Sequence, residues 1–170
     1  MRTLIVLMAL LGLCPAAFAE CPVGNIEKAL GASLEGLRKT EREVSDVQST
    51  EGGVWRIYRR KDGTLNSIVR LDGGESGMSE RRLSVINART YGISVTRVDY
   101  LRHAFIDQAG PNGTAKRTTD YYYFCNGKLV VPAAEYATVD TAAYARAGEE
   151  ARSAMVLDRD IASDTRALAR

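Results

Sequence analysis

Few residues of this 170-residue chain have the chemistry of a catalytic centre. His103 is the only histidine, so a Ser-His-Asp or Cys-His site would have to be built around it. It lies within a strand-like pattern, where a packed or half-exposed histidine is expected rather than a general base. The nucleophile-elbow pattern G-x-S-x-G is absent, because Ser76 has Gly74 two residues before it but Met78 two residues after it.

A pair of carboxylates is the catalytic arrangement that the sequence leaves open. Glu75 and Glu80 bracket the end of a glycine-rich stretch, which brings them loosely together. Two carboxylic acids flanking a scissile bond are what glycosidase-type hydrolysis needs. A glycine-rich stretch is also what an ordinary turn requires, so a carboxylate-based hydrolase is an alternative function. The motifs H-E-x-x-H, P-loop and G-x-G-x-x-G are absent, so zinc, nucleotide and dinucleotide chemistry have no support.

Residues 1–19 have the pattern of a secretory signal peptide. Arg2 precedes an apolar run over 4–13, Pro15 follows it, and Ala17-Phe18-Ala19 matches an A-x-A cleavage site. The run is about half of the roughly twenty residues that a membrane-spanning helix requires. We therefore expect cleavage after Ala19, a periplasmic or secreted location and no stable membrane insertion. The remaining residues, 20–170, have the length of one domain.

Cleavage would remove Cys14 and leave two cysteines, Cys21 and Cys125. In an oxidising compartment such a pair predicts a disulfide, with two free thiols as the alternative. The bond would close a loop of about a hundred residues, for which the chain-entropy model gives roughly 4–5 kcal/mol. Two distant thiols and one histidine are too few ligands for a metal site, and no cofactor is expected.

Tyrosine and arginine are the side chains best suited to contact a partner protein. Tyr121, Tyr122 and Tyr123 are consecutive in a predicted strand, so at least one of them must face away from the core. A second set would form a patch if its strands are neighbours: Trp55, Tyr58, Arg59, Arg60, Arg81 and Arg82. Core aromatics with solvated arginines are the alternative explanation for both sets.

The charge balance does not favour nucleic acid as a partner. Once Arg2 is removed with the signal peptide, 22 basic and 21 acidic side chains remain. A net charge so close to zero, together with export, lacks the electrostatic footprint of a nucleic-acid-binding domain.

Periodicity predicts the elements that carry these residues. Apolar residues at spacings of three, four and seven indicate an amphipathic helix over 24–48. Hairpins are expected at Asp62-Gly63 and Asn126-Gly127, the second within the stretch 119–132. Further strands are predicted over 80–87 and 93–105, separated by a turn at Tyr91-Gly92.

The rest of the chain is predicted to hold a surface loop and a second helix. The loop covers 107–118, which contains Gly110-Pro111-Asn112-Gly113. An alanine-rich helix begins at Asp140 and breaks near 158–160. The order of helix, antiparallel strands and helix predicts an α+β domain with a meander sheet of about five or six strands, an N-terminal helix and a long C-terminal helix.

Several of these turn motifs resemble those of small secreted bacterial β-rich proteins of unknown function. They are Glu51-Gly52-Gly53, Tyr58, Asp62-Gly63-x-Leu65-x-x-Ile68, Gly74-Glu75-x-Gly77 and the later Tyr-Tyr-Phe-x-Asn-Gly-Lys-Leu. The resemblance covers 51–131 and departs where this chain has a longer connection before its tyrosine-rich strand. It implies a secreted β-rich fold, and it implies no activity and no site residues.

These observations predict a non-enzymatic, exported domain that binds another protein. An inhibitor or immunity protein for a cell-wall hydrolase or a delivered toxin would have these features. The first alternative is a carrier that holds a small apolar or lipid ligand between sheet and helices, which would need a closed apolar pocket.

Overall fold

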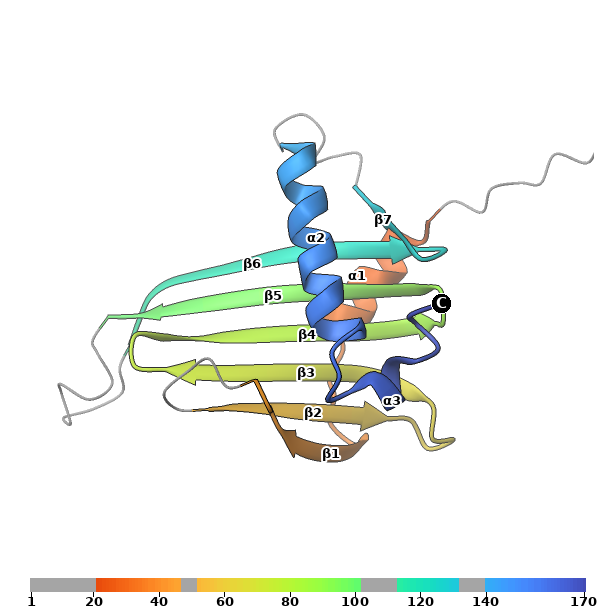
Figure 1. Cartoon of the computed structure of the whole chain (residues 1–170), viewed down its shortest axis with the longest axis horizontal. Coiled ribbons are helices and arrows are strands. Elements are labelled where there is room, and N and C mark those ends of the chain that lie inside the picture. The colour runs from red at the N-terminus through yellow and green to blue at the C-terminus, as the bar shows by residue number, and fades with distance from the viewer. Residues whose placement is uncertain (1–20, 47–51, 102–112, 132–139) are drawn as a thin grey trace, which may run out of the picture.

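A computed structural model describes residues 21–46, 52–101, 113–131 and 140–170 of the chain (Figure 1). Their elements are α1 (Val23–Gly31), β1 (Arg38–Glu43), β2 (Gly53–Arg59), β3 (Leu65–Gly74), β4 (Gly77–Asn87), β5 (Thr90–Tyr100), β6 (Thr114–Cys125), β7 (Lys128–Val130), α2 (Thr141–Val156) and α3 (Ala162–Thr165). The seven strands pair in chain order into one antiparallel meander sheet. The predicted α+β class and meander are confirmed, with seven described strands instead of five or six.

The prediction of one helix over 24–48 is wrong. Helix α1 ends at Gly31, the next residue is extended, and Gly36 has a φ of +76°, a left-handed value that interrupts a right-handed helix. The chain then forms β1, whose six residues are all exposed at the edge of the sheet. The apolar spacing therefore identified a helix correctly only around Ile26 and Leu30, which are buried.

The turn at Asn126-Gly127 is the predicted type I′ turn. Both residues have positive φ, 53° and 73°, which is what this turn demands. The hairpin at Asp62-Gly63 is also present, but only Gly63 has a positive φ, and the loop is longer than two residues. There the carboxylate of Asp62 accepts a hydrogen bond from the backbone N–H of Thr64 at 2.9 Å.

Two further predictions about the strands need correction. Tyr91-Gly92 is not a turn but part of β5, since the β4–β5 hairpin connects Asn87 to Thr90. Residues 114–118 of the predicted loop over 107–118 belong to β6 instead, and residues 107–112 lie outside the described residues. His103 lies outside the described residues.

The two faces of the sheet are covered differently. In Figure 1, α2 crosses the front face and α1 lies behind the sheet. The face below α2 carries the main core, whose largest buried side chains include Trp55, Ile57, Ile68, Leu83, Ile93, Phe124, Met155 and Ile161. The face below α1 carries a smaller buried cluster of Ile26, Leu30, Tyr123 and Cys125. One face is thus a hydrophobic layer, and the other is covered by α1 along only part of its length.

The C-terminal region follows the prediction closely. Helix α2 begins after Asp140, whose carboxylate accepts the backbone N–H groups of Ala142 and Ala143, each at 3.0 Å. The helix ends at Val156, so the break expected near 158–160 is confirmed.

Among the described residues, no helix is long and apolar enough to cross a membrane.

Candidate functional site

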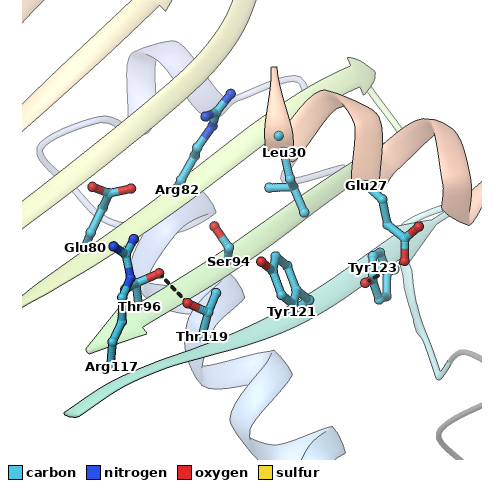
Figure 2. A pocket seen from close by; sticks show the side chains of 11 residues that line it. Glu27, Leu30, Glu80, Arg82, Ser94, Thr96, Arg117, Thr119, Tyr121 and Tyr123 are labelled. Carbon is cyan, nitrogen blue, oxygen red and sulfur yellow. Dashed lines mark hydrogen bonds between the residues drawn. The ribbon is translucent and has the colours of Figure 1, made fainter. Parts of the chain in front are cut away.

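The exposed part of the sheet beside α1 forms a groove of about 520 Å³, which we call the α1 groove. One wall is α1 and the floor consists of β4, β5 and β6 (Figure 2). Its lining residues are Glu27, Leu30, Gly31, Glu80, Arg82, Ser94, Thr96, Arg117, Thr119, Tyr121 and Tyr123. Most of them carry a charge or a hydroxyl group, which suits a polar surface or ligand rather than a hydrocarbon chain.

Gly92 allows α1 to lie close against the sheet. A Cβ atom at this position would be 2.4 Å from Cγ2 of Ile26 and 2.8 Å from Cδ1 of Leu30. Both distances are below van der Waals contact, so only glycine accommodates the helix without displacement. The residue that resembled a turn signal is therefore the packing site of the groove wall.

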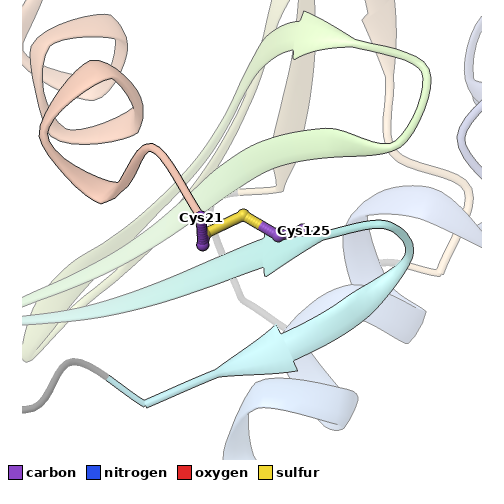
Figure 3. The surroundings of a disulfide bond; sticks show 2 residues. All are labelled: Cys21 and Cys125. Atoms are coloured by element: carbon purple, nitrogen blue, oxygen red, sulfur yellow. A yellow bond between two sulfur atoms is a disulfide. The ribbon is translucent and has the colours of Figure 1, made fainter. Parts of the chain in front are cut away.

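The predicted disulfide between Cys21 and Cys125 is confirmed (Figure 3). Its Cα atoms are 5.8 Å apart, although 104 positions separate the residues in sequence. Cys21 lies two residues before the start of α1, and Cys125 is the last residue of β6. The bond thus ties the start of the groove wall to the floor.

Polar contacts hold the middle and the C-terminal end of α1. In the middle of the helix, the hydroxyl of Tyr123 donates to Oε1 of Glu27 at 3.1 Å. At its end, Nη2 of Arg82 donates to the carbonyl oxygens of Ala29 and Ala32, at 3.1 and 2.7 Å. Carbonyl groups at a helix C-terminus have no partner within the helix, so the guanidinium group satisfies them.

The charged guanidinium group of Arg82 is partly buried. Burial lowers the pKa of its guanidinium group, because desolvation disfavours the charged form, and the nearby Glu80 carboxylate partly offsets this effect. Nε of Arg82 also donates to Oγ of Ser84 at 3.1 Å. Arg82 therefore acts first as a structural clamp on α1 and also lines the groove.

The part of the groove away from α1 is more accessible. Figure 2 shows Glu80 and Arg117 at one end and Glu27 with Tyr123 at the other. The hydroxyl groups of Thr96 and Thr119 are 2.9 Å apart on the floor between them. Tyr121 is 44% exposed, so the groove reaches the molecular surface.

The carboxylates of the groove are not arranged as a hydrolytic pair. Strand pairing places Glu80 in line with Thr119 of β6, whereas Glu27 is bonded to Tyr123. These two positions of β6 are four residues apart, which corresponds to roughly 13 Å along a strand. Glycosidase carboxyl groups are about 5–9.5 Å apart. Glu75 occupies the β3–β4 turn, outside the groove lining.

Strand alternation separates the three consecutive tyrosines. Tyr121 and Tyr123 line the α1 groove, and of these Tyr121 is the exposed one. Tyr122 is 5% exposed on the opposite face, where its ring centroid is 5.3 Å from that of Tyr144. The groove therefore contains two members of the triplet and presents one to solvent.

The second predicted set does not gather on one surface. Trp55 is fully buried in the main core, and its Nε1 donates to Oδ2 of Asp160 at 3.4 Å. Arg59 forms an ion pair with Asp164 of α3.

Other members of this set make separate contacts. Arg81 forms an ion pair with Asp72 at 2.8 Å, on the α2 face. Arg60 donates to the carbonyl oxygen of Val85 at 2.9 Å. Tyr58 is half-buried on the α1 face, paired with Ser67 and outside the groove lining.

Several groove residues were not predicted as site residues: Glu27, Ser94, Thr96, Arg117 and Thr119. Each looks like an ordinary polar residue of a helix or strand. The signal that identifies them is period-two polarity shared by three strands, with Glu80 and Arg82 in β4 and matching polar positions in β5 and β6. Such a pattern is expected on a part of a sheet face that no apolar helix surface covers.

Comparisons with protein-family models, with curated proteins and with solved structures found no match to this chain.

Proposed function

We propose that this chain is an exported, non-enzymatic domain that binds another protein through the α1 groove. The observation that carries the proposal is the exposed Tyr121 in a polar groove whose wall is fixed to the sheet. Tyrosine and arginine are enriched among residues that dominate binding energy. Tyr121 and the exposed Arg117 therefore form the centre of the proposed contact surface.

The rigidity of the groove supports a binding role. A disulfide, the Arg82 clamp and the Tyr123–Glu27 hydrogen bond hold α1 before any partner arrives. A surface that is already ordered loses less conformational entropy on association, which favours affinity. A standard interface buries about 800 Å² of surface on each partner. A contact of that size would extend beyond the groove onto the surrounding sheet.

The location proposed for this function is the periplasm or the extracellular space. The signal-peptide pattern of residues 1–19 and the disulfide both fit an oxidising compartment. A compact, stapled domain with an ordered contact surface suits an inhibitor or immunity protein for a cell-wall hydrolase or a delivered toxin. The polar lining gives the alternative of an apolar or lipid carrier no specific support.

Affinity capture from a periplasmic extract tests the proposal, with the disulfide-intact protein as bait. Tyr121→Ser removes the exposed ring, and Leu157→Ser is the matched control, because Leu157 is 52% exposed just after α2. We expect wild type and Leu157→Ser to retain the same protein. Tyr121→Ser should weaken its binding by about 30-fold, the effect of a hot-spot residue worth about 2 kcal/mol. Recovery of no specific protein, or equal retention by all three baits, would overturn the proposal.

A further inference from the structure

Among the described residues, strand β6 has a long edge with no strand paired to it. On its outer side β7 pairs only with Tyr123, Phe124 and Cys125, and the described part of the chain places no other strand beside Thr114–Tyr122 (Figure 1). Most of this segment is exposed. Backbone groups along such an edge are a template for pairing with another strand.

The hairpin determines which peptide groups point toward this edge. In a two-residue hairpin the flanking pair, Cys125 and Lys128, is hydrogen-bonded, and bonded pairs then occur at every second residue. By this alternation Tyr121, Thr119 and Arg117 direct their backbone N–H and C=O groups outward. The hydroxyl of Tyr144 already donates to the carbonyl oxygen of Tyr121 at 2.9 Å, in agreement with this direction. Arg117 and Thr119 therefore offer the accessible backbone groups.

We propose that this edge pairs with the same edge of a second copy of the chain, antiparallel and across a twofold axis at Thr118. In this register Arg117 of each copy exchanges backbone hydrogen bonds with Thr119 of the other. Thr118 lies opposite itself, which is a favourable cross-strand pair. The two sheets would then be continuous.

The side chains favour this register over its neighbours. It places Lys116 opposite Asp120 of the second copy at two symmetric positions. Asp120 contacts Arg97 through Oδ2 at 2.9 Å, and its side chain is 48% exposed, so a second cation can approach its carboxylate. Opposite charges facing each other stabilise a strand pair.

Registers shifted by one bonded pair lose these features. A shift in one direction places Arg117 opposite Arg117, so that like charges face each other. A shift in the other direction places Lys116 opposite Tyr122, which is 5% exposed beneath α2. Two features thus select one register. One is which residues direct their backbone groups outward, and the other is which charged side chains then face each other.

The twofold axis would be perpendicular to the sheet, so both α1 grooves would lie on the same side of the dimer. Strand pairing alone buries less surface than a permanent dimer needs, so we expect association that depends on protein concentration. The pairing does not depend on the identity of any other partner protein.

Sedimentation velocity of the purified, disulfide-intact protein over a wide concentration range tests the dimer. Lys116→Asp and Asp120→Lys each place like charges opposite one another, and each should weaken self-association on the order of tenfold. An equimolar mixture of the two variants restores opposite charges at both positions and should dimerise again. Circular dichroism confirms that each variant is folded.

Hydrogen exchange of the wild-type protein tests the register without any variant. With rising concentration the amides of Arg117 and Thr119 should become protected, whereas Thr118 and Asp120 should be protected throughout by pairing with β5. The proposal is overturned if the protein stays monomeric and the first two amides exchange rapidly at all concentrations. A dimer that is unaffected by either charge reversal would also overturn it.

Discussion

The hydroxyl of Tyr123 donates a hydrogen bond to the carboxylate of Glu27, with 3.1 Å between the oxygens and 96 positions between the residues. This contact joins β6 to α1, and the disulfide ties the residues just before α1 to the end of the same strand. Arg82 holds the opposite end of the helix. The α1 groove is therefore a product of long-range contacts, and its stability can be tested one contact at a time.

Replacement of Cys125 by Ser should lower stability under oxidising conditions. The lost crosslink closes a loop of 104 positions, and the chain-entropy model assigns it roughly 4–5 kcal/mol. A melting temperature lower by on the order of 10 °C is expected for a domain of this size. Differential scanning calorimetry measures the shift, and wild type with a reductant is the control. Equal melting temperatures with and without the bond would contradict this role.

Gly92→Ala should displace α1 and destabilise the protein. The added Cβ would meet Ile26 and Leu30 at 2.4 and 2.8 Å, and overpacking of this kind costs about 1–3 kcal/mol. Gly31→Ala is the matched control, since a Cβ there has no described atom within 4 Å and alanine favours the helix. Urea denaturation should show a lower midpoint for the first variant only. A similar midpoint for both variants would refute the packing argument.

Arg82→Met should loosen the end of α1. The variant keeps a long side chain but leaves the carbonyl oxygens of Ala29 and Ala32 without their charged donor, which should cost about 1–3 kcal/mol. Amide exchange within α1 should accelerate. Arg81→Met is the control, because Arg81 lies on the other face and pairs with a half-buried Asp72. If both variants leave exchange in α1 unchanged, Arg82 is not its clamp.

Asp160 should make stability sensitive to acid. The hydroxyl and backbone N–H of Ser45 donate to its carboxylate at 2.6 and 2.8 Å, and these bonds lower the pKa of Asp160. A carboxyl group with a lowered pKa in the folded state stabilises the protein above its unfolded pKa of about 3.9. That contribution is lost as the pH falls through the folded pKa.

Asp160→Asn tests this acid dependence. The variant should be less stable than wild type at neutral pH, by on the order of 1 kcal/mol for a weakened hydrogen bond. The difference should shrink as the pH falls below the unfolded pKa of about 3.9, and it should vanish below the lowered folded pKa, where the wild-type carboxylate is protonated. Urea denaturation at several pH values measures it. A difference that is constant across this range would exclude the proposed linkage.

The sequence by itself determined the features that depend on local backbone chemistry, and the disulfide, for which only one pair of cysteines was left. Asn126 and Gly127 are among the few residues that adopt positive φ readily, so their turn could be predicted. Asp140 could be predicted as a cap because its short carboxylate reaches free N–H groups. Cys21 had only one partner once the signal segment was set aside.

Only the tertiary structure decided what depends on neighbouring elements. Strand β1 has no apolar alternation, and contacts with β2 such as the 2.9 Å ion pair between Arg56 and Glu41 hold it in the sheet. Alternation required one tyrosine of the triplet to face outward, but the position of α2 decided that Tyr122 is buried and Tyr121 exposed. The groove joins residues about ninety positions apart. Polar alternation marks the strand face, but nothing local in the sequence shows that α1 lies beside it.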